Sequence, residues 1–182
     1  MKLSGTQTFP APRQKVWEFL IDPQRLAKCM PGCEKLEPVG ENEYSGVINV
    51  GLAAVKGMYN GKVKLDELQP PTHYKMTLDG KGKQGFIKGA GTIDLEEQNG
   101  QTLLKYTGDI QIGGLLASVG QRMIDGAAKM TIGQFFTAME AEIKAMPGEE
   151  VRQGVAINLW RSFLKWLRGL FAGLFGKKTT TQ

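Results

Sequence analysis

Residue types suited to chemistry are scarce in this chain, which has two cysteines and one histidine among 182 residues. Cys29 and Cys33 flank Pro31 and Gly32 at a C-x3-C spacing. Two thiols and one distant imidazole cannot supply the four ligands of a structural zinc site, and dithiol redox motifs use C-x-x-C. We therefore expect no metal site and two small buried or turn-flanking thiols, with a redox pair as the alternative.

Catalytic constellations are also missing from the pattern. The histidine, His73, follows Pro70 and Pro71 and is typical of an exposed turn. No Ser-His-Asp or Cys-His-Asn set accompanies it, and spacing alone places no pair of carboxylates across a site. We predict no catalytic residues and no enzyme activity, with turnover by a cavity carboxylate or by His73 as the alternative.

The segment Gly80–Gly85 matches the G-x-G-x-x-G pattern of dinucleotide-binding proteins. That chemistry needs a helix after the glycines, so that its N-terminus holds a pyrophosphate. Residues 86–95 instead alternate as a strand, which predicts a hairpin turn or a bent sheet. The nearby Lys81, Lys83 and Lys88 are interspersed with acids and lack interleaved aromatics, so we expect no nucleic-acid partner.

The net charge of +5 is unevenly placed along the chain. Residues 1–155 hold 18 basic and 18 acidic residues, while the last 27 hold five basic and no acidic residues. The N-terminus has no apolar core of a signal peptide, and no run of 18 apolar residues predicts a membrane span. With few cysteines, these features predict a protein of the reducing cytoplasm.

Hydrophobic periodicity predicts the order of elements. Short helices are expected at 16–21 and 24–30, after a first strand over 1–9. Further strands are expected at 34–39, 43–50, 54–68, 73–81, 85–97 and 102–112, with a tight turn at Asn99-Gly100. A helical stretch follows over 115–146. Its apolar face changes phase between Gly126 and Gly133, where we expect a kink.

This order predicts an α+β fold, in which a curved antiparallel sheet wraps on a long C-terminal helix so that both apolar faces are buried. The arrangement is the helix-grip fold, whose hallmark is a cavity between helix and sheet. Apolar side chains are the candidates for binding a ligand there, with plain core packing as an equal alternative. The candidates are Phe19, Met30, Val47, Met58, Phe86, Leu115, Leu116, Val119, Met123, Met130 and Phe136.

The chain is predicted to divide into a ligand-binding domain over 1–146, a linker over 147–155 and a basic amphipathic tail over 156–182. At about 100° per residue, the large apolar residues from Ile157 to Phe175 fall in one half of the helical wheel. The predicted membrane-binding residues are Leu159, Trp160, Arg161, Phe163, Leu164, Lys165, Trp166, Leu167, Arg168, Leu170, Phe171, Leu174, Phe175, Lys177 and Lys178.

Tryptophan, phenylalanine and leucine opposite lysine and arginine are typical of a helix in the interface of an anionic membrane. The alternatives are a helix that binds a groove on a partner or pairs with itself, and one that packs on the body. We expect attachment to a lipid surface.

Several segments together resemble the CoxG family, the G-type subunits of carbon monoxide dehydrogenase, which belongs to the START-like, or SRPBCC, superfamily. The most specific is Cys29–Glu34, with the sequence C-M-P-G-C-E, about ten residues after the first short helix. Asp22-Pro23, the glycine-rich Gly80–Gly91 and Gly113–Gly120 add to it. The resemblance covers roughly residues 1–146, and the tail is similar to that of members that have one.

The resemblance implies a non-catalytic protein that attaches a molybdenum-containing carbon monoxide dehydrogenase, or a related hydroxylase, to the inner face of the cell membrane. It also implies a cavity for an apolar ligand. We expect no covalent cofactor and a bound isoprenoid quinone, menaquinone-like, that links the cytoplasmic enzyme to the respiratory chain. The alternatives are a pure membrane anchor without ligand and a general lipid-binding or lipid-transfer protein.

Overall fold

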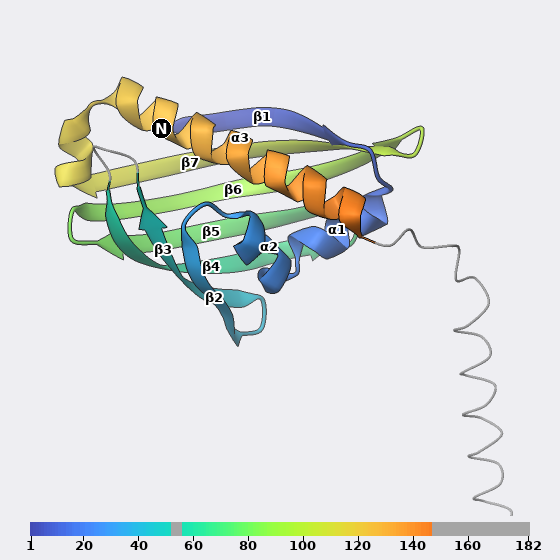
Figure 1. The fold of residues 1–182 in the computed structure, drawn as a ribbon, viewed down its shortest axis with the longest axis horizontal. Coiled ribbons are helices and arrows are strands. Elements are labelled where there is room, and N and C mark those ends of the chain that lie inside the picture. Colours follow the sequence, from blue (N-terminus) through green and yellow to red (C-terminus); the bar gives the residue numbers. More distant parts are fainter. Residues whose placement is uncertain (52–55, 147–182) are drawn as a thin grey trace, which may run out of the picture. The chain divides into compact units, whose positions relative to one another are not determined.

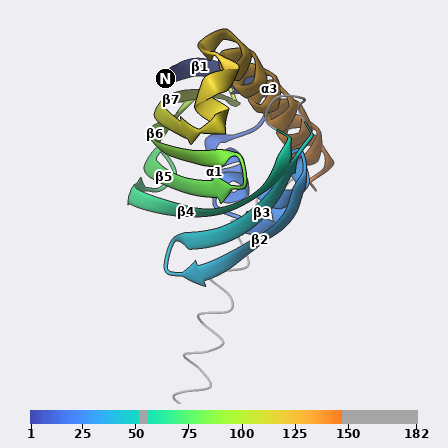
Figure 2. The same ribbon diagram turned by 90° about the vertical axis from the view of Figure 1, so that its left-hand side faces the viewer.

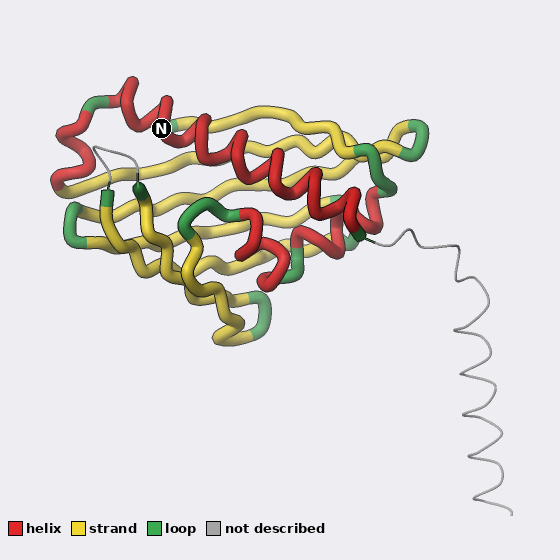
Figure 3. The backbone as a smooth tube through the Cα atoms, viewed as in Figure 1, coloured by secondary structure: helices red, strands yellow, loops and turns green. Residues whose placement is uncertain are grey.

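The computed structural model describes residues 1–51 and 56–146, in which seven antiparallel strands form one sheet with the order β1-β7-β6-β5-β4-β3-β2 (Figure 1). The strands are β1 (Lys2–Phe9), β2 (Cys33–Gly40), β3 (Glu43–Val50), β4 (Gly57–Gln69), β5 (His73–Gly82), β6 (Gly85–Gln98) and β7 (Gln101–Gly114). The helices are α1 (Arg13–Leu20), α2 (Pro23–Cys29), the 3-10 helix η2 (Leu115–Val119) and α3 (Gln121–Ala145). The predicted α+β helix-grip order is therefore confirmed (Figure 3).

Two sequence signals for tight turns are also confirmed. Asn99 and Gly100 connect β6 to β7 with φ values of 52° and 74°, a backbone that this residue pair adopts readily. The glycine-rich motif lies at the β5–β6 hairpin, where Gly82 pairs with Gly85. No helix begins there, so the motif builds a turn of the sheet.

The long helical stretch differs from the prediction at one point. Gly120 adopts φ +95°, a left-handed conformation that favours glycine, and separates η2 from α3. Beyond it, α3 is one continuous helix through Gly126 and Gly133. The predicted break is therefore wrong in position, because the apolar pattern alone did not show which glycine leaves helical backbone space.

The two short helices seal one end of the sheet. The carboxylate of Asp22 accepts hydrogen bonds from the N–H groups of Gln24 at 2.9 Å and Arg25 at 3.3 Å, which caps α2 at Pro23. Thr102, a fully buried polar residue, donates its hydroxyl to the carbonyl oxygen of Ala11 at 2.7 Å. These bonds fix how the chain enters and leaves α1 and α2.

The hydrophobic core lies between this end of the sheet and the C-terminal half of α3. Phe136, Met139 and Ile143 on α3 pack with buried residues of α1 and the sheet. The ring of Phe136 meets that of Phe9 edge-on, with centroids 6.0 Å apart. Figure 2 shows α3 running across the concave side of the curved sheet.

The predicted linker and tail, residues 147–182, lie outside the described residues, as do residues 52–55. Among the helices that the structure does describe, none has the length and apolar character needed to cross a membrane.

Candidate functional site

The face of the sheet that carries the core is called here the inner face. Directly paired residues of antiparallel strands point to the same side, and alternate residues of one strand point to opposite sides. The buried residues Leu65, Tyr74, Ile93 and Leu104 therefore define which residues of β4 to β7 point inward. The same parity can be followed along each strand into the part beyond the core.

The packed core ends abruptly in the middle of the inner face. Leu65 and Met76 are paired across β4 and β5, yet Leu65 is 6% exposed and Met76 is 36% exposed. β5 is the central strand of the seven, so Met76 is far from either edge of the sheet. An exposed methionine at that place means that the inner face there is accessible to a ligand.

Further inward-pointing apolar residues continue from Met76 to the end of the sheet where β4 and β6 begin. They are half-buried and lie outside the core cluster, in contrast to the residues beside α1. We name this region the inner apolar surface, which consists of Ile48, Met76, Leu78, Ile87, Ile110 and Ile112.

Glycines make part of this surface flat. Gly46, Gly61 and Gly80 are paired in one row across β3, β4 and β5, so three neighbouring strands present no side chain there. A Cβ added at Gly80 would come no closer than 3.6 Å to its nearest neighbour, the carbonyl oxygen of Ile87, and φ at Gly80 is not left-handed. Neither backbone conformation nor crowding therefore requires glycine at this position.

Four tyrosines bring hydroxyl groups to the inner face. Tyr44, Tyr59, Tyr74 and Tyr106 all have the inward parity on their strands. Burial raises the pKa of the phenols of Tyr74, Tyr59 and Tyr44, with the charge of Asp22 contributing at Tyr44. The hydroxyl of Tyr44 donates to the carbonyl oxygen of Ile21 at 3.4 Å. Neutral phenols of this kind can donate hydrogen bonds to a carbonyl group.

The sequence-predicted ligand residues fall into three groups. Phe19, Leu116 and Phe136 are buried, and Phe19 and Phe136 belong to the core cluster, so their observed contacts are packing contacts. Met30 and Val119 are half-buried, and their contact with a ligand stays a prediction. The six others do not lie where a space between helix and sheet was expected.

Three of the six point away from α3. Val47 pairs with Asn60, Met58 with Asn49 and Phe86 with Gly113, and all have the outward parity on β3, β4 and β6. Their placement between helix and sheet is corrected here. The cause is the two-residue period of a strand, because an error of one position moves a side chain to the opposite face.

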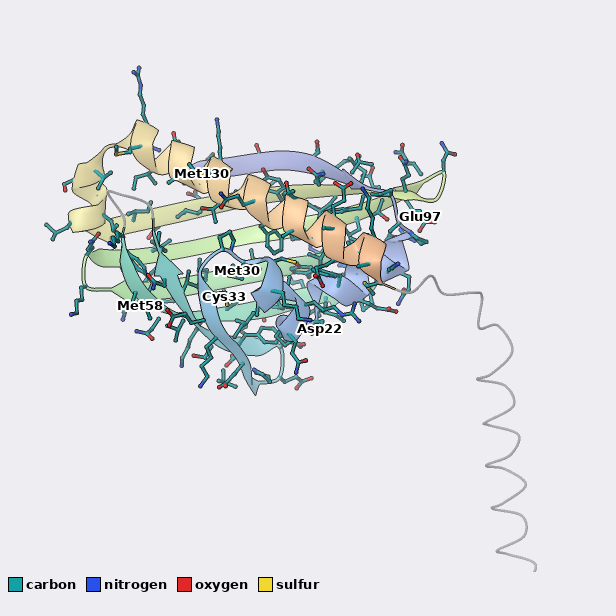
Figure 4. The ribbon with its side chains drawn as sticks, viewed as in Figure 1. Asp22, Met30, Cys33, Met58, Glu97 and Met130 are labelled. Atoms are coloured by element: carbon teal, nitrogen blue, oxygen red, sulfur yellow. The ribbon has the colours of Figure 1, made fainter. Side chains whose placement is uncertain are left out.

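The remaining three are exposed. Leu115 is 71%, Met123 58% and Met130 50% exposed, so they do not line the inner face in this structure. Figure 4 shows Met130 on α3 and Met58 at a strand end. A helical wheel places these residues on one face but cannot show which face turns to the sheet; the buried face of α3 carries Phe136, Met139 and Ile143.

Sequence reasoning missed the inner apolar surface almost entirely. The signal that could have located it is parity: from Tyr74, steps of two lead to Met76 and Leu78 on β5. The same steps lead back from Ile93 to Ile87 on β6. The alternation was visible, but its inward sense depended on which residues α1 and α3 cover.

A second hollow, of about 650 Å³, lies on the outer face of the sheet. Its lining includes Lys62, Lys64, Asp79, Lys88 and Asp109, and Lys88 pairs with Asp79 at 3.3 Å. These charges make it unsuited to an apolar ligand.

The groups suited to catalysis or metal binding stay apart in the described part of the chain. The imidazole Nδ1 of His73 lies 2.7 Å from the carboxylate of Asp94 on the outer face. No group of three or more potential metal-ligating side chains was found among residues 1–51 and 56–146. Cys29 is buried, Cys33 is half-buried, and both are free thiols.

The fold and the inner face can now be compared with known proteins. A model of the CoxG family, described as the G-type subunit of carbon monoxide dehydrogenase, matches residues 5–144. The chain belongs to the CoxG family. The predicted family is therefore confirmed over most of the chain. No curated protein sequence matches it.

Solved structures support the CoxG assignment and the fold. A conserved protein from Geobacillus kaustophilus is 38% identical, with a TM-score of 0.78, covering 80% of this chain and 96% of that one. A START superfamily protein from Mycobacterium smegmatis is 12% identical, with a TM-score of 0.62 and coverages of 80% and 98%. The protein Ara h 8.0201 is 19% identical, with the same TM-score and coverages. The last two show likeness of fold alone.

CoxG membership and the START-like fold together suggest a hydrophobic-ligand-binding protein associated with carbon monoxide dehydrogenase. Within the described residues, the inner apolar surface is the region whose position and exposure suit such a ligand.

Proposed function

We propose that this protein is a non-catalytic carrier that binds a respiratory quinone on its inner apolar surface and serves a molybdenum-containing carbon monoxide dehydrogenase at the cytoplasmic face of the membrane. The observation that carries the proposal is the 36% exposure of Met76 on the central strand of the sheet. A side chain at that place would be buried if the fold needed it only for packing.

The chemistry of the inner face supports a quinone. An isoprenoid chain is apolar and branched, which suits the isoleucines and the adaptable Met76. A quinone ring is flat and accepts hydrogen bonds at two carbonyl oxygens. The row of Gly46, Gly61 and Gly80 leaves room for a ring, and neutral tyrosine hydroxyls supply donors.

The membrane part of the proposal rests on the sequence of residues 156–182. Its tryptophans, phenylalanines and leucines would enter the lipid interface, while Arg161, Lys165 and Arg168 would face anionic headgroups. A peripheral carrier of this kind would bring ligand and dehydrogenase to the same surface. The dehydrogenase is proposed as partner from CoxG membership.

The test is to incubate the full-length protein with vesicles that contain menaquinone, reisolate it and analyse an organic extract by mass spectrometry. We expect stoichiometric quinone. Two variants on neighbouring residues provide a matched pair: Met76→Trp fills the inner surface, and Thr77→Trp places the same indole on the outer face. Met76→Trp should lose most of the quinone and Thr77→Trp should retain it.

Other outcomes decide against parts of the proposal. Equal loading of both folded variants would exclude the inner apolar surface as the site. Phospholipid in place of quinone would indicate a general lipid carrier. No ligand in the extract, together with recruitment of the dehydrogenase to quinone-free membranes, would indicate a pure anchor.

A further inference from the structure

Three connections of the described chain meet at the end of the sheet beyond the inner apolar surface. The side-chain amide of Gln84, in the β5–β6 turn, donates to the carbonyl oxygen of Lys56 at 2.6 Å. The carbonyl oxygen of Gln84 accepts a hydrogen bond from the N–H of Leu116 in η2 at 3.0 Å. Figure 1 shows η2, the β5–β6 turn and the first residues of β4 at the same end.

Exposed apolar side chains gather at this end. Met58 is 43%, Phe86 38% and Leu115 71% exposed, one from each of the three connected segments. Only seven large hydrophobic residues are exposed in the described part of the chain, so three in one place are a concentration. Met58 and Phe86 lie on the outer side of the sheet end and Leu115 lies on η2.

The charges at this end have one sign. Segments 47–60, 80–87 and 110–124 contain Lys56, Lys81, Lys83 and Arg122 and no aspartate or glutamate. All four basic side chains are exposed, and none forms an ion pair with another described residue. The rest of residues 1–155 therefore carries an acidic excess, because those residues as a whole are balanced.

We propose that this end of the body, the rim formed by Lys56, Met58, Lys83, Phe86, Leu115 and Arg122, docks on an anionic lipid surface. Its apolar side chains would enter the headgroup region while its basic side chains meet lipid phosphates. Apolar residues bordered by basic ones, with acids excluded, match a negatively charged interface in both terms. An acidic protein surface would match the charge but would not call for protruding methionine, phenylalanine and leucine.

The rim gives the membrane contact an orientation. It lies next to Ile87 and Ile112, the part of the inner apolar surface nearest the strand ends. With the rim against the bilayer, an apolar ligand passes between lipid and inner face without crossing water. This step rests on the proposed function, whereas contact of the rim with lipid does not.

The contact is tested in the full chain with an environment-sensitive fluorophore on an introduced cysteine, in a Cys33→Ser background. Leu115→Cys places it on the rim. Val39→Cys is the matched control, because Val39 is also an exposed hydrophobic residue, 54% exposed, but lies in the β2–β3 hairpin. With phosphatidylglycerol vesicles, we expect a blue shift at residue 115 and none at residue 39. No shift at 115 while the protein cosediments with the vesicles would overturn the docking.

The consequence for ligand transfer is tested with the triple variant Met58→Gln, Phe86→Gln and Leu115→Gln, measured with menaquinone. Uptake from vesicles should slow about tenfold or more, since apolar contact with the bilayer is lost. Equilibrium loading from detergent should not change, because the rim lies outside the inner apolar surface. Unchanged uptake would overturn the rim as an entry point. Absence of loading in the unaltered protein would instead refute the proposed quinone function and leave the fluorescence result to decide the docking.

Discussion

Gln84 and Lys56 join two hairpin connections that are 28 residues apart in the chain, through a 2.6 Å hydrogen bond from the side-chain amide to the backbone carbonyl. The same residue, Gln84, holds η2 through its own carbonyl oxygen. One glutamine therefore positions the three segments that surround the open end of the inner face.

Gln84→Ala removes the amide donor and leaves the backbone bond to Leu116. We expect the free energy of unfolding to fall by about 0.5–1.5 kcal/mol, the usual net value of one hydrogen bond. Amide hydrogen exchange should quicken in the connections around the rim and not at the core residue Leu95. Gln14→Ala is the matched control, since Gln14 also donates its amide, to the exposed Glu18 on α1. Equal exchange at the rim in both variants would contradict a positioning role for Gln84.

The two cysteines should react slowly as nucleophiles. Burial raises the pKa of the Cys29 thiol above its ordinary value of 9.0, with the charge of Glu142 adding to the effect and Lys28 opposing it. Burial also raises the pKa of Cys33. At pH 8 we expect alkylation by iodoacetamide to be much slower than for a free thiol, because the thiolate is the reacting species.

The same shift has a consequence for stability at high pH. A raised pKa in the folded state stabilises the protein fully below the thiol's ordinary value, and this contribution is lost as the pH rises through the folded-state value. Cys29→Ala should therefore weaken the fall in stability above about pH 9 seen in denaturant titrations. The same fall with and without Cys29 would show that its titration is not coupled to folding.

The tail should control the strength of vesicle binding. Replacing Arg161, Lys165 and Arg168 by serine should cost about 3 kcal/mol in binding to phosphatidylglycerol vesicles, near 1 kcal/mol per basic residue. Binding of the unaltered protein should weaken with salt and should fall strongly on truncation after Gly154. Vesicle cosedimentation measures both. Equal binding by the truncated protein would contradict the predicted role of the tail.

The order of strands and helices could be predicted from sequence because each signal for it is local. Alternation marked β3 with its observed bounds, and Asn99-Gly100 marked a turn that needs only its own backbone angles. The family was also accessible, since the segment Cys29–Glu34 is a contiguous piece of sequence. The position of the helix break was not, because Gly120, Gly126 and Gly133 are equally permissive by residue type.

The candidate site depended on information that no local pattern contains. Met58 and Met76 are both methionines on neighbouring strands, but one points outward at a strand end and the other inward at the centre of the sheet. Choosing between them requires knowing which face α1 and α3 cover. Leu115 and Leu116 are adjacent and chemically identical, yet they are 71% and 1% exposed.

The sequence by itself determined the class of fold, the family and the concentration of basic and aromatic residues after residue 155, because periodicity, motif and composition are properties of the chain alone. Only the tertiary structure decided that the core stops between Leu65 and Met76, and that Lys56, Phe86 and Leu115 share one end of the molecule. The physical reason is that burial is shared among segments far apart in the chain. A side chain is covered or exposed according to what the folded chain brings against it.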